Sequence, residues 1–156
     1  MEKINIGIDK SSRDKVSEIL NKILSDEYVL YTKIRNFHWN VNGIHFNDLH
    51  KFFEEQYESI NESIDEIAER IRMLGNFPKA SLKDFLENSS IKEVNKVLKS
   101  EEMILELLND NEYLIREIRQ NLEKVSKLND AGNEDFLNAL MQKHEKIAWF
   151  LRSMNI

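Results

Sequence analysis

The sequence predicts an all-α protein built as a four-helix bundle. Helix breakers are sparse, with four glycines and one proline among 156 residues. Between them, apolar residues recur at three- and four-residue steps, which is the period of an amphipathic helix. No segment alternates with the two-residue period of a strand. Three long segments and a somewhat shorter last one therefore favour a bundle.

The boundaries of the helices follow from capping and turn residues. Ser11 or Ser12 is the expected N-cap of the first helix and Asn47 that of the second, while Ser90 and Glu93 suit a capping box at the start of the third. The expected helices cover residues 12–39, 47–74, 81–86 (a short one), 90–129 and 133 onward.

The connection between the second and third long helices is the longest one expected. It covers about 15 residues, more than a tight hairpin needs. Such a segment can run the length of the bundle, as in bundles with one long crossover. The whole chain, 1–156, is expected to be one domain with a short N-terminal tail at about 1–11.

Composition excludes several classes of function. The chain has no cysteine, so disulfides, thiolate metal sites and cysteine nucleophiles are unavailable. It has no apolar run as long as a membrane span and no signal-peptide layout at Met1–Asn5, so a cytoplasmic location is expected. The net charge of −6 disfavours a protein held to nucleic acid by its overall field.

Histidines and carboxylates share one stripe of the predicted second helix. At 100° per residue, Glu54, Asp65 and Glu69 lie at about 40°, 60° and 100° from His50. His38 lies just before the turn that leads into this helix. Histidine with carboxylate and no thiolate is the ligand set expected for iron or a similar metal.

The spacing of these residues predicts a site shared between two chains. His50 and Asp65 are separated by roughly 22 Å along a helix that rises 1.5 Å per residue, too far to bind one ion. His38, His50 and Glu54 can cluster at one end, and Asp65 and Glu69 form a carboxylate pair at the other. A two-fold axis that sets two such helices antiparallel would create two equivalent composite sites.

A site within one chain is the minor alternative. Di-iron bundle proteins use Glu-x-x-His pairs on their helices, and this sequence contains none. Glu27 interrupts the apolar stripe of the first helix and could instead combine with Glu62, Asp65 or Glu69.

Five segments of the chain resemble the Dps family, the mini-ferritins named for DNA protection in starved cells. The resemblance extends from about residue 12 to the C-terminus, and its first block is the most specific. The matching residues are Asn36-Phe37-His38-Trp39-Asn40-Val41-x-Gly43, Phe46-x-x-Leu49-His50, Phe53-Glu54-Glu55-x-Tyr57, Asp65-Glu66-Ile67-Ala68-Glu69-Arg70-Ile71-Arg72-x-Leu74-Gly75 and Glu145-Lys146-x-x-Trp149-Phe150-Leu151.

The resemblance implies a ferritin-like fold and a hollow homododecamer. It implies oxidation of Fe(II), preferably with hydrogen peroxide (H2O2), at di-iron sites, and storage of the ferric product inside. The implied ligands are His38, His50 and Glu54 of one chain with Asp65 and Glu69 of its neighbour. Position 54 is more often aspartate in that family, so the role of Glu54 is the least defined.

The remaining histidines and the tryptophans are expected to be structural. His45 falls in the turn and is expected to be exposed or to support the ligands indirectly. His144 lies between Leu140 and Ile147 on an apolar stripe, which favours a hydrogen-bonded core histidine over a ligand. Trp39 and Trp149 are expected to pack, although Trp39 adjoins His38 and could donate electrons.

Three acids gather at the start of the last helix, namely Asp130, Glu134 and Asp135. In the structural interpretation, these carboxylates stabilise the helix by interacting with the positive end of its dipole. The functional alternative is that they line a three-fold pore and attract iron, as acids in this region do in the resembled family.

The sequence also predicts weak or absent DNA binding. In residues 1–11, Lys3 and Lys10 are balanced by Glu2 and Asp9. This segment therefore has no net positive charge with which to neutralise DNA phosphates and release their counterions. A DNA-compacting stress protein and a ferritin-like recognition protein without catalysis are the alternatives to iron oxidation.

Overall fold

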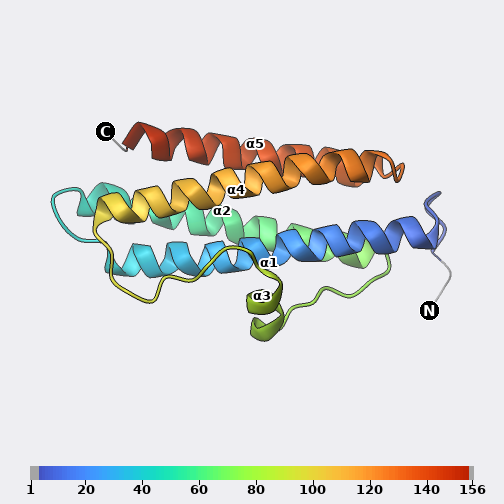
Figure 1. Ribbon diagram of the computed structural model, residues 1–156, viewed down its shortest axis with the longest axis horizontal. Coiled ribbons are helices and arrows are strands. Elements are labelled where there is room, and N and C mark those ends of the chain that lie inside the picture. The colour runs from blue at the N-terminus through green and yellow to red at the C-terminus, as the bar shows by residue number, and fades with distance from the viewer. Residues whose placement is uncertain (1–3, 155–156) are drawn as a thin grey trace.

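The computed structural model describes residues 4–154, and in this range it contains helices and no strand. The helices are α1 (Lys10–Asn40), α2 (Phe46–Met73), α3 (Leu82–Asn88), α4 (Ser100–Ser126) and α5 (Ala131–Met154). The four long helices lie side by side, and the short α3 lies outside the bundle against α1 (Figure 1). The predicted all-α bundle is confirmed.

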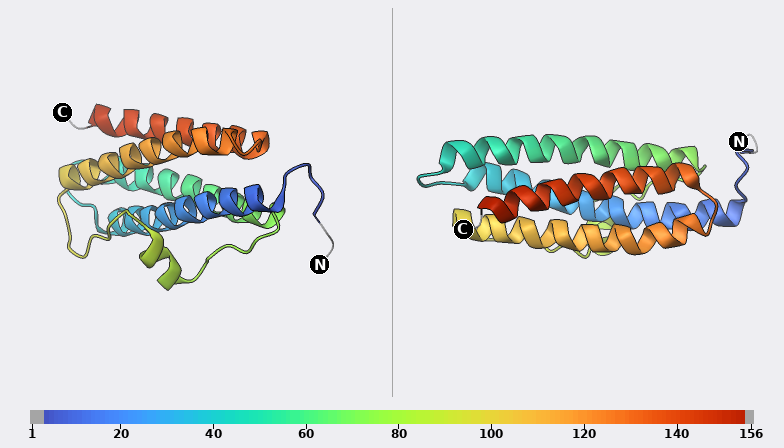
Figure 2. Two further views of the ribbon diagram at one scale, coloured as in Figure 1. Left: turned by 45° about the vertical axis from the view of Figure 1, so that its right-hand side comes forward. Right: turned by 90° about the horizontal axis from the view of Figure 1, so that it is seen from above.

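The long helices form two hairpins joined by a crossover. α1 pairs with α2, and α4 pairs with α5. Residues 74–99 return along the length of the bundle, so α2 and α4 begin at the same end (Figures 1 and 2). This one-crossover topology is the one that ferritin-like folds use.

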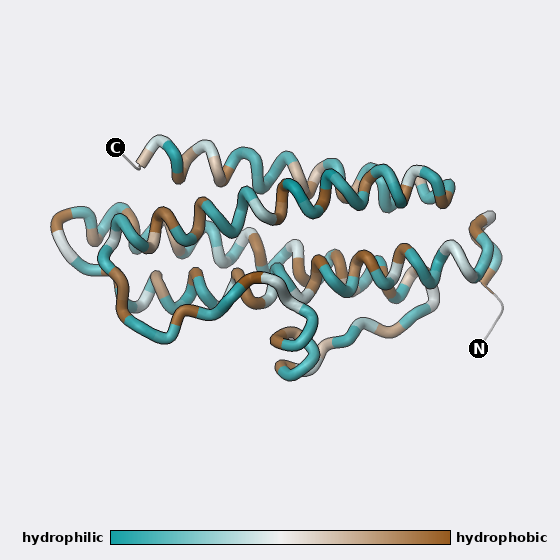
Figure 3. Tube along the Cα trace, in the orientation of Figure 1, coloured by the Kyte–Doolittle hydropathy of each residue, from teal (hydrophilic) through white to brown (hydrophobic). Residues whose placement is uncertain are grey.

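The core consists of two apolar clusters along the bundle axis. One lies toward the α1–α2 turn and includes Phe37 and Phe53, and the other lies toward the opposite end and includes Leu20 and Ile71. Apolar positions recur along each long helix between hydrophilic ones (Figure 3). Each helix therefore buries one face and leaves the other solvated.

Helix α1 begins slightly earlier than the serines predicted. Asp9 is its N-cap and accepts hydrogen bonds from the Ser12 backbone N–H at 3.1 Å and from Ser12 Oγ at 2.6 Å. An aspartate caps as well as a serine does, so Ser11 and Ser12 lie in the first turn.

The other boundaries agree with prediction to within a few residues, with one exception. His45 is the N-cap residue of α2, two residues before the predicted Asn47, and makes no side-chain capping bond. Ser81 and Asp84 form a capping box that starts α3. Helix α5 begins at Ala131 and not near Asn133.

The predicted start of the third long helix at Ser90 is wrong, because α4 begins at Ser100. Before it, the backbone N–H groups of Ser90 and Ile91 donate to the buried Asp26 Oδ1 at 2.7 and 3.4 Å, as does Ser89 Oγ at 2.9 Å. An extended segment also spans more than twice the distance per residue that a helix does. Residues 89–99 therefore extend the crossover to the end of the bundle where α4 begins, and their first residues attach it to Asp26 of α1.

The start of the described chain is held against the end of α2. Arg13 Nε donates to the Leu74 carbonyl at 3.1 Å, and Arg13 Nη1 donates to the Ile8 carbonyl at 2.6 Å. Gly75 has a φ of +90°, and a Cβ at this position would clash with Ile4. The predicted tail is thus anchored at Ile4 and Ile8, whereas Asn5, Ile6 and Gly7 are exposed. Glu2 and Lys3 lie outside the described residues.

None of the helices within residues 4–154 combines the length and apolarity that a membrane span requires.

Candidate functional site

The α1–α2 turn brings His38 and His50 together. His38 lies in the last turn of α1 and His50 near the start of α2. Gly43 permits the short connection, since its φ of +100° is a conformation that residues with a side chain rarely adopt. The two imidazole rings stack with their centroids 3.7 Å apart and their planes inclined by 22°. The predicted histidine pair is therefore formed within one chain.

Each imidazole is fixed by the backbone of the other histidine. His38 Nδ1 donates to the His50 carbonyl at 2.8 Å, and His50 Nδ1 donates to the His38 carbonyl at 2.9 Å. A carbonyl oxygen only accepts, so both Nδ1 atoms carry a proton. In the neutral rings, both Nε2 lone pairs are consequently available to a metal ion.

The stacked rings cannot bind a single ion as they stand. An imidazole nitrogen binds a metal near the plane of its own ring, and two planes 3.7 Å apart with a 22° inclination do not meet near the nitrogens. Each ring can instead serve its own ion. Metal ions in two-metal sites are typically about 3.5–4 Å apart, which is similar to the stacking distance.

Glu54 and Tyr57 lie beside the histidines. Glu54 follows His50 by one helical turn and is half-buried on the same face of α2. Tyr57 Oη donates to Glu54 Oε1 at 3.4 Å, and its ring meets the His38 ring edge-on at 5.3 Å. Burial raises the pKa of the Tyr57 phenol, and the charges of Glu54 and Glu58 raise it further.

Asp65 and Glu69 lie farther along α2 and are exposed. Because α2 is continuous from Phe46 to Met73, Asp65 is roughly 22 Å from His50 at 1.5 Å per residue. Within residues 4–154 of one chain, no three His, Asp or Glu side chains are grouped closely enough to hold a metal ion. The predicted ligands thus lie in two separate groups within one chain.

The minor alternative of a site built on Glu27 is not formed. Glu27 is fully buried, whereas Glu62, Asp65 and Glu69 are exposed on α2. Its partner is His144 of α5, whose Nε2 lies 2.6 Å from Glu27 Oε1. His144 is a hydrogen-bonded core residue, as predicted.

A third side chain completes this buried cluster. Asn111 Nδ2 donates to the Leu107 carbonyl at 2.7 Å, so its Oδ1 accepts from His144 Nδ1 at 2.8 Å. With Nδ1 protonated, the contact between His144 Nε2 and Glu27 requires one further proton between them. Three helices are therefore connected by one proton-bridged polar chain.

The acids at the start of α5 separate into two kinds. Asp130 is buried, and its two carboxylate oxygens accept from the Asn133 backbone N–H at 3.1 Å and from Asn133 Nδ2 at 2.7 Å. This is helix capping, the structural interpretation. Glu134 is half-exposed and Asp135 exposed, and the pore role of the three acids stays a prediction.

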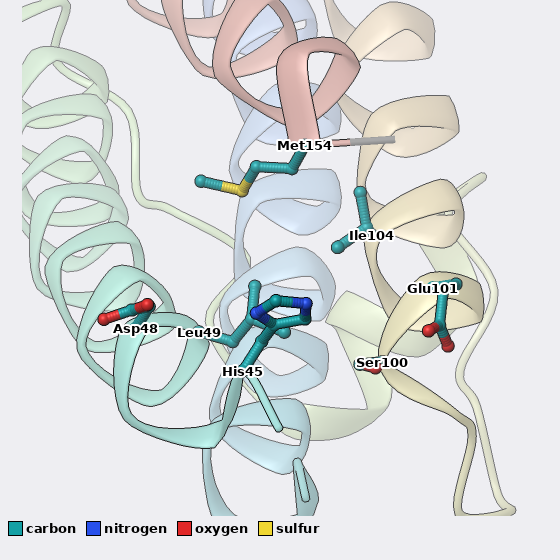
Figure 4. A pocket seen from close by; sticks show the side chains of 7 residues that line it. All are labelled: His45, Asp48, Leu49, Ser100, Glu101, Ile104 and Met154. Atoms are coloured by element: carbon teal, nitrogen blue, oxygen red, sulfur yellow. The ribbon is translucent and has the colours of Figure 1, made fainter. Parts of the chain in front are cut away.

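A cavity of about 330 Å³ opens at the end of the bundle, between α2, α4 and α5 (Figure 4). Leu49, Ile104 and Met154 form its apolar part, and His45 lies at its edge. His45 is exposed, as expected. The cavity contains none of the five predicted ligands.

The structure adds Tyr31 and Arg35 to the surroundings of the histidine pair. Arg35 Nη1 donates to Tyr31 Oη at 2.7 Å, and the guanidinium lies over the rings of Tyr31, Tyr57 and Trp39 at 5.6, 5.1 and 5.0 Å. Within this cluster, the sequence predicted a role for Trp39 alone. The four-residue spacing of Tyr31, Arg35 and Trp39 places them on one face of a helix, and this spacing could have indicated the cluster from the sequence.

Comparisons with known proteins agree with this fold. A model of the ferritin-like domain matches residues 17–155. The DNA protection during starvation protein 2 of Bacillus anthracis is 40% identical and covers 89% of this chain and 95% of its own length. An uncharacterized low temperature-induced protein of Nostoc sp. is 42% identical, with 98% and 87% covered.

A solved structure is similar over the whole chain. It is the Dps protein of Vibrio cholerae O1, described as a member of a broad superfamily of ferritin-like diiron-carboxylate proteins. Its TM-score is 0.93 at 30% identity, and the match covers 99% of this chain and 97% of that one. The fold and these matches together show that the protein is ferritin-like. Within that class, the chain belongs to the Dps family.

Proposed function

We propose that the protein is an iron-detoxifying and iron-storing mini-ferritin. It oxidises Fe(II) with hydrogen peroxide at di-iron sites made by two subunits and keeps the ferric product inside a hollow dodecamer in the cytoplasm. The observation that carries the proposal is the reciprocal fixing of His38 and His50, which leaves two metal-binding nitrogens beside Glu54. Membership in the Dps family supports it.

The ligand types suit this reaction. Exposed Asp65 and Glu69 of a two-fold partner supply carboxylates, which stabilise Fe(III) more than Fe(II), while neutral imidazoles limit the negative charge of the site. Two Fe(II) ions supply the two electrons that peroxide needs: 2 Fe(II) + H2O2 + 2 H⁺ → 2 Fe(III) + 2 H2O. No hydroxyl radical is released when both electrons arrive together.

A mixing experiment tests the shared site directly. One variant carries His38→Ala and His50→Ala, and the other carries Asp65→Ala and Glu69→Ala. Each alone is expected to lose peroxide-dependent formation of ferric absorbance. Co-expressed at equal amounts, half of the two-fold pairs are mixed and each mixed pair has one complete site, so the rate should recover to about a quarter of the original.

An inactive mixture would contradict the proposal. If each chain held a complete site, the mixture would be as inactive as its components. Light scattering during size-exclusion chromatography provides the control, because all assemblies are expected to be dodecamers. Lower mass in either variant would mean that assembly, and not the site, had been changed.

DNA compaction is the weaker candidate, although three relatives are named for DNA protection. In the described N-terminal segment, Lys10 is paired with Asp14 at 2.6 Å, and Arg13 donates to backbone carbonyls. Arg13 is therefore engaged within the fold, and the charge of Lys10 is offset by a neighbouring carboxylate. A recognition role without catalysis is disfavoured by the two metal-ready imidazoles.

A further inference from the structure

The histidine pair is in contact with a row of tyrosines. The Tyr57 ring meets His38 on one side and, at 6.2 Å, the Tyr31 ring on the other. Tyr31 in turn lies 5.9 Å from Tyr28. Aromatic rings in contact with each other and with a redox site are positioned to exchange electrons with it.

The surroundings distinguish Tyr57 from Tyr31. The Arg35 guanidinium lies over both rings, 5.6 Å from that of Tyr31 and 5.1 Å from that of Tyr57. Of the two hydroxyls, that of Tyr31 accepts a hydrogen bond from it at 2.7 Å, and a cation bound to the oxygen makes removal of an electron harder. The Tyr57 hydroxyl donates to the Glu54 carboxylate at 3.4 Å, which can receive the phenol proton as an electron leaves. Tyr57 is therefore the easier of the two to oxidise.

A partly loaded iron site creates a need for such a donor. Peroxide takes two electrons, but one Fe(II) supplies only one and leaves a hydroxyl radical. We propose that Tyr57 supplies the second electron when a single Fe(II) occupies the site. This inference rests on the proposed ferroxidase function.

The step is balanced as Fe(II) + H2O2 + Tyr57-OH + H⁺ → Fe(III) + Tyr57-O• + 2 H2O. The O–O bond of peroxide breaks, and one electron comes from iron and one from the phenol. The phenol proton passes by way of Glu54 to the product water, and the remaining proton comes from solvent. Tyr57 thus acts as a catalytic residue only at half-loaded sites.

Electron paramagnetic resonance tests this role. Anaerobic protein with one Fe(II) per site is mixed with one equivalent of hydrogen peroxide and frozen. The original protein should give a tyrosyl radical signal, and Tyr57→Phe should lose it. A spin trap should capture more hydroxyl radical from Tyr57→Phe than from the original protein. Tyr57→Phe keeps the ring and its contacts, and a melting curve checks that the fold is unchanged.

Matched variants and loading states make the result specific. Tyr113→Phe changes a tyrosine that instead bonds Asp26 and should leave the signal intact. With two Fe(II) per site, the original protein should form ferric product without a radical. A merely structural role for Tyr57 would give no tyrosyl radical in the original protein even at half loading.

Two outcomes would overturn the inference. One is a signal unchanged in Tyr57→Phe, and the other is a signal that disappears only in Trp39→Phe. Failure of the proposed function is distinguishable, because the original protein would then form no ferric product even at full loading.

Discussion

At the scale of single residues, the backbone orients the predicted ligands. The tautomers of His38 and His50 are set by each other's carbonyls, so no second side chain is needed to orient either ring. The arrangement depends on the geometry of the α1–α2 turn. Sequence spacing placed both histidines near this turn but contained no information on their reciprocal hydrogen bonds.

The buried pair of Glu27 and His144 leads to a prediction about stability. Glu27→Ala should lower the free energy of unfolding by about 3–5 kcal/mol, since it leaves a buried partner uncompensated. Replacing both residues by apolar ones, Glu27→Leu with His144→Phe, should cost much less. Denaturant unfolding of all variants at one protein concentration measures both effects.

A control for this prediction lies on the surface. Glu145 forms an ion pair with Arg119 at the same 2.6 Å, but both side chains are largely exposed. Glu145→Ala should cost less than about 1 kcal/mol. Equal costs for Glu27→Ala and Glu145→Ala would contradict the role of burial.

At the scale of elements, the crossover shows how tertiary contacts override a local pattern. The apolar spacing at Val94 and Val97 predicted helix, yet Val97 is 68% exposed in an irregular segment. Ser90 looked like an N-cap residue, but its backbone N–H donates to Asp26, which is distant in sequence. The need to reach the far end of the bundle excluded a helix there.

Asp26 is therefore predicted to hold the crossover in place. Asp26→Ala removes the acceptor of the Ser90 N–H and of Ser89 Oγ, and an unsatisfied buried group costs about 1–3 kcal/mol. Amide hydrogen exchange, followed by mass spectrometry, should become faster in peptides covering residues 89–92. Protection within α5 should persist, because the change is local.

Asp14→Asn is the matched control for Asp26→Ala. Asp14 lies near the start of the same helix, α1, and its carboxylate accepts a hydrogen bond from Asn76, far from the crossover residues 89–92. It should leave exchange in residues 89–92 unchanged. Faster exchange throughout the bundle in Asp26→Ala would mean that Asp26 supports the whole fold.

At the scale of the whole molecule, charge and the split ligand set determine what the protein can bind. The net charge is −6, and the two groups of predicted ligands lie at two places along α2. A single chain therefore brings together only part of the predicted ligand set, so the proposed iron site depends on a second chain. The negative net charge does not favour DNA as a partner.

Weak DNA binding is the corresponding prediction. In a gel-shift assay at about 150 mM salt, where exposed charges farther apart than about 8 Å are screened, the protein should not retard duplex DNA. A variant with an added lysine-rich N-terminal extension should bind and should lose affinity as salt increases. Tight binding by the unextended protein at this salt concentration would contradict the prediction.

The sequence by itself determined the all-α bundle, the long crossover and the five candidate ligands, because helical periodicity and ligand chemistry are local properties. It also indicated, from the rise of one helix, that His50 and Asp65 cannot share an ion within a chain. Only the tertiary structure decided where α4 begins, how the imidazoles stack and which core groups pair. Asp26 with Ser90 and Glu27 with His144 are far apart in sequence, and folding alone brings such groups into contact.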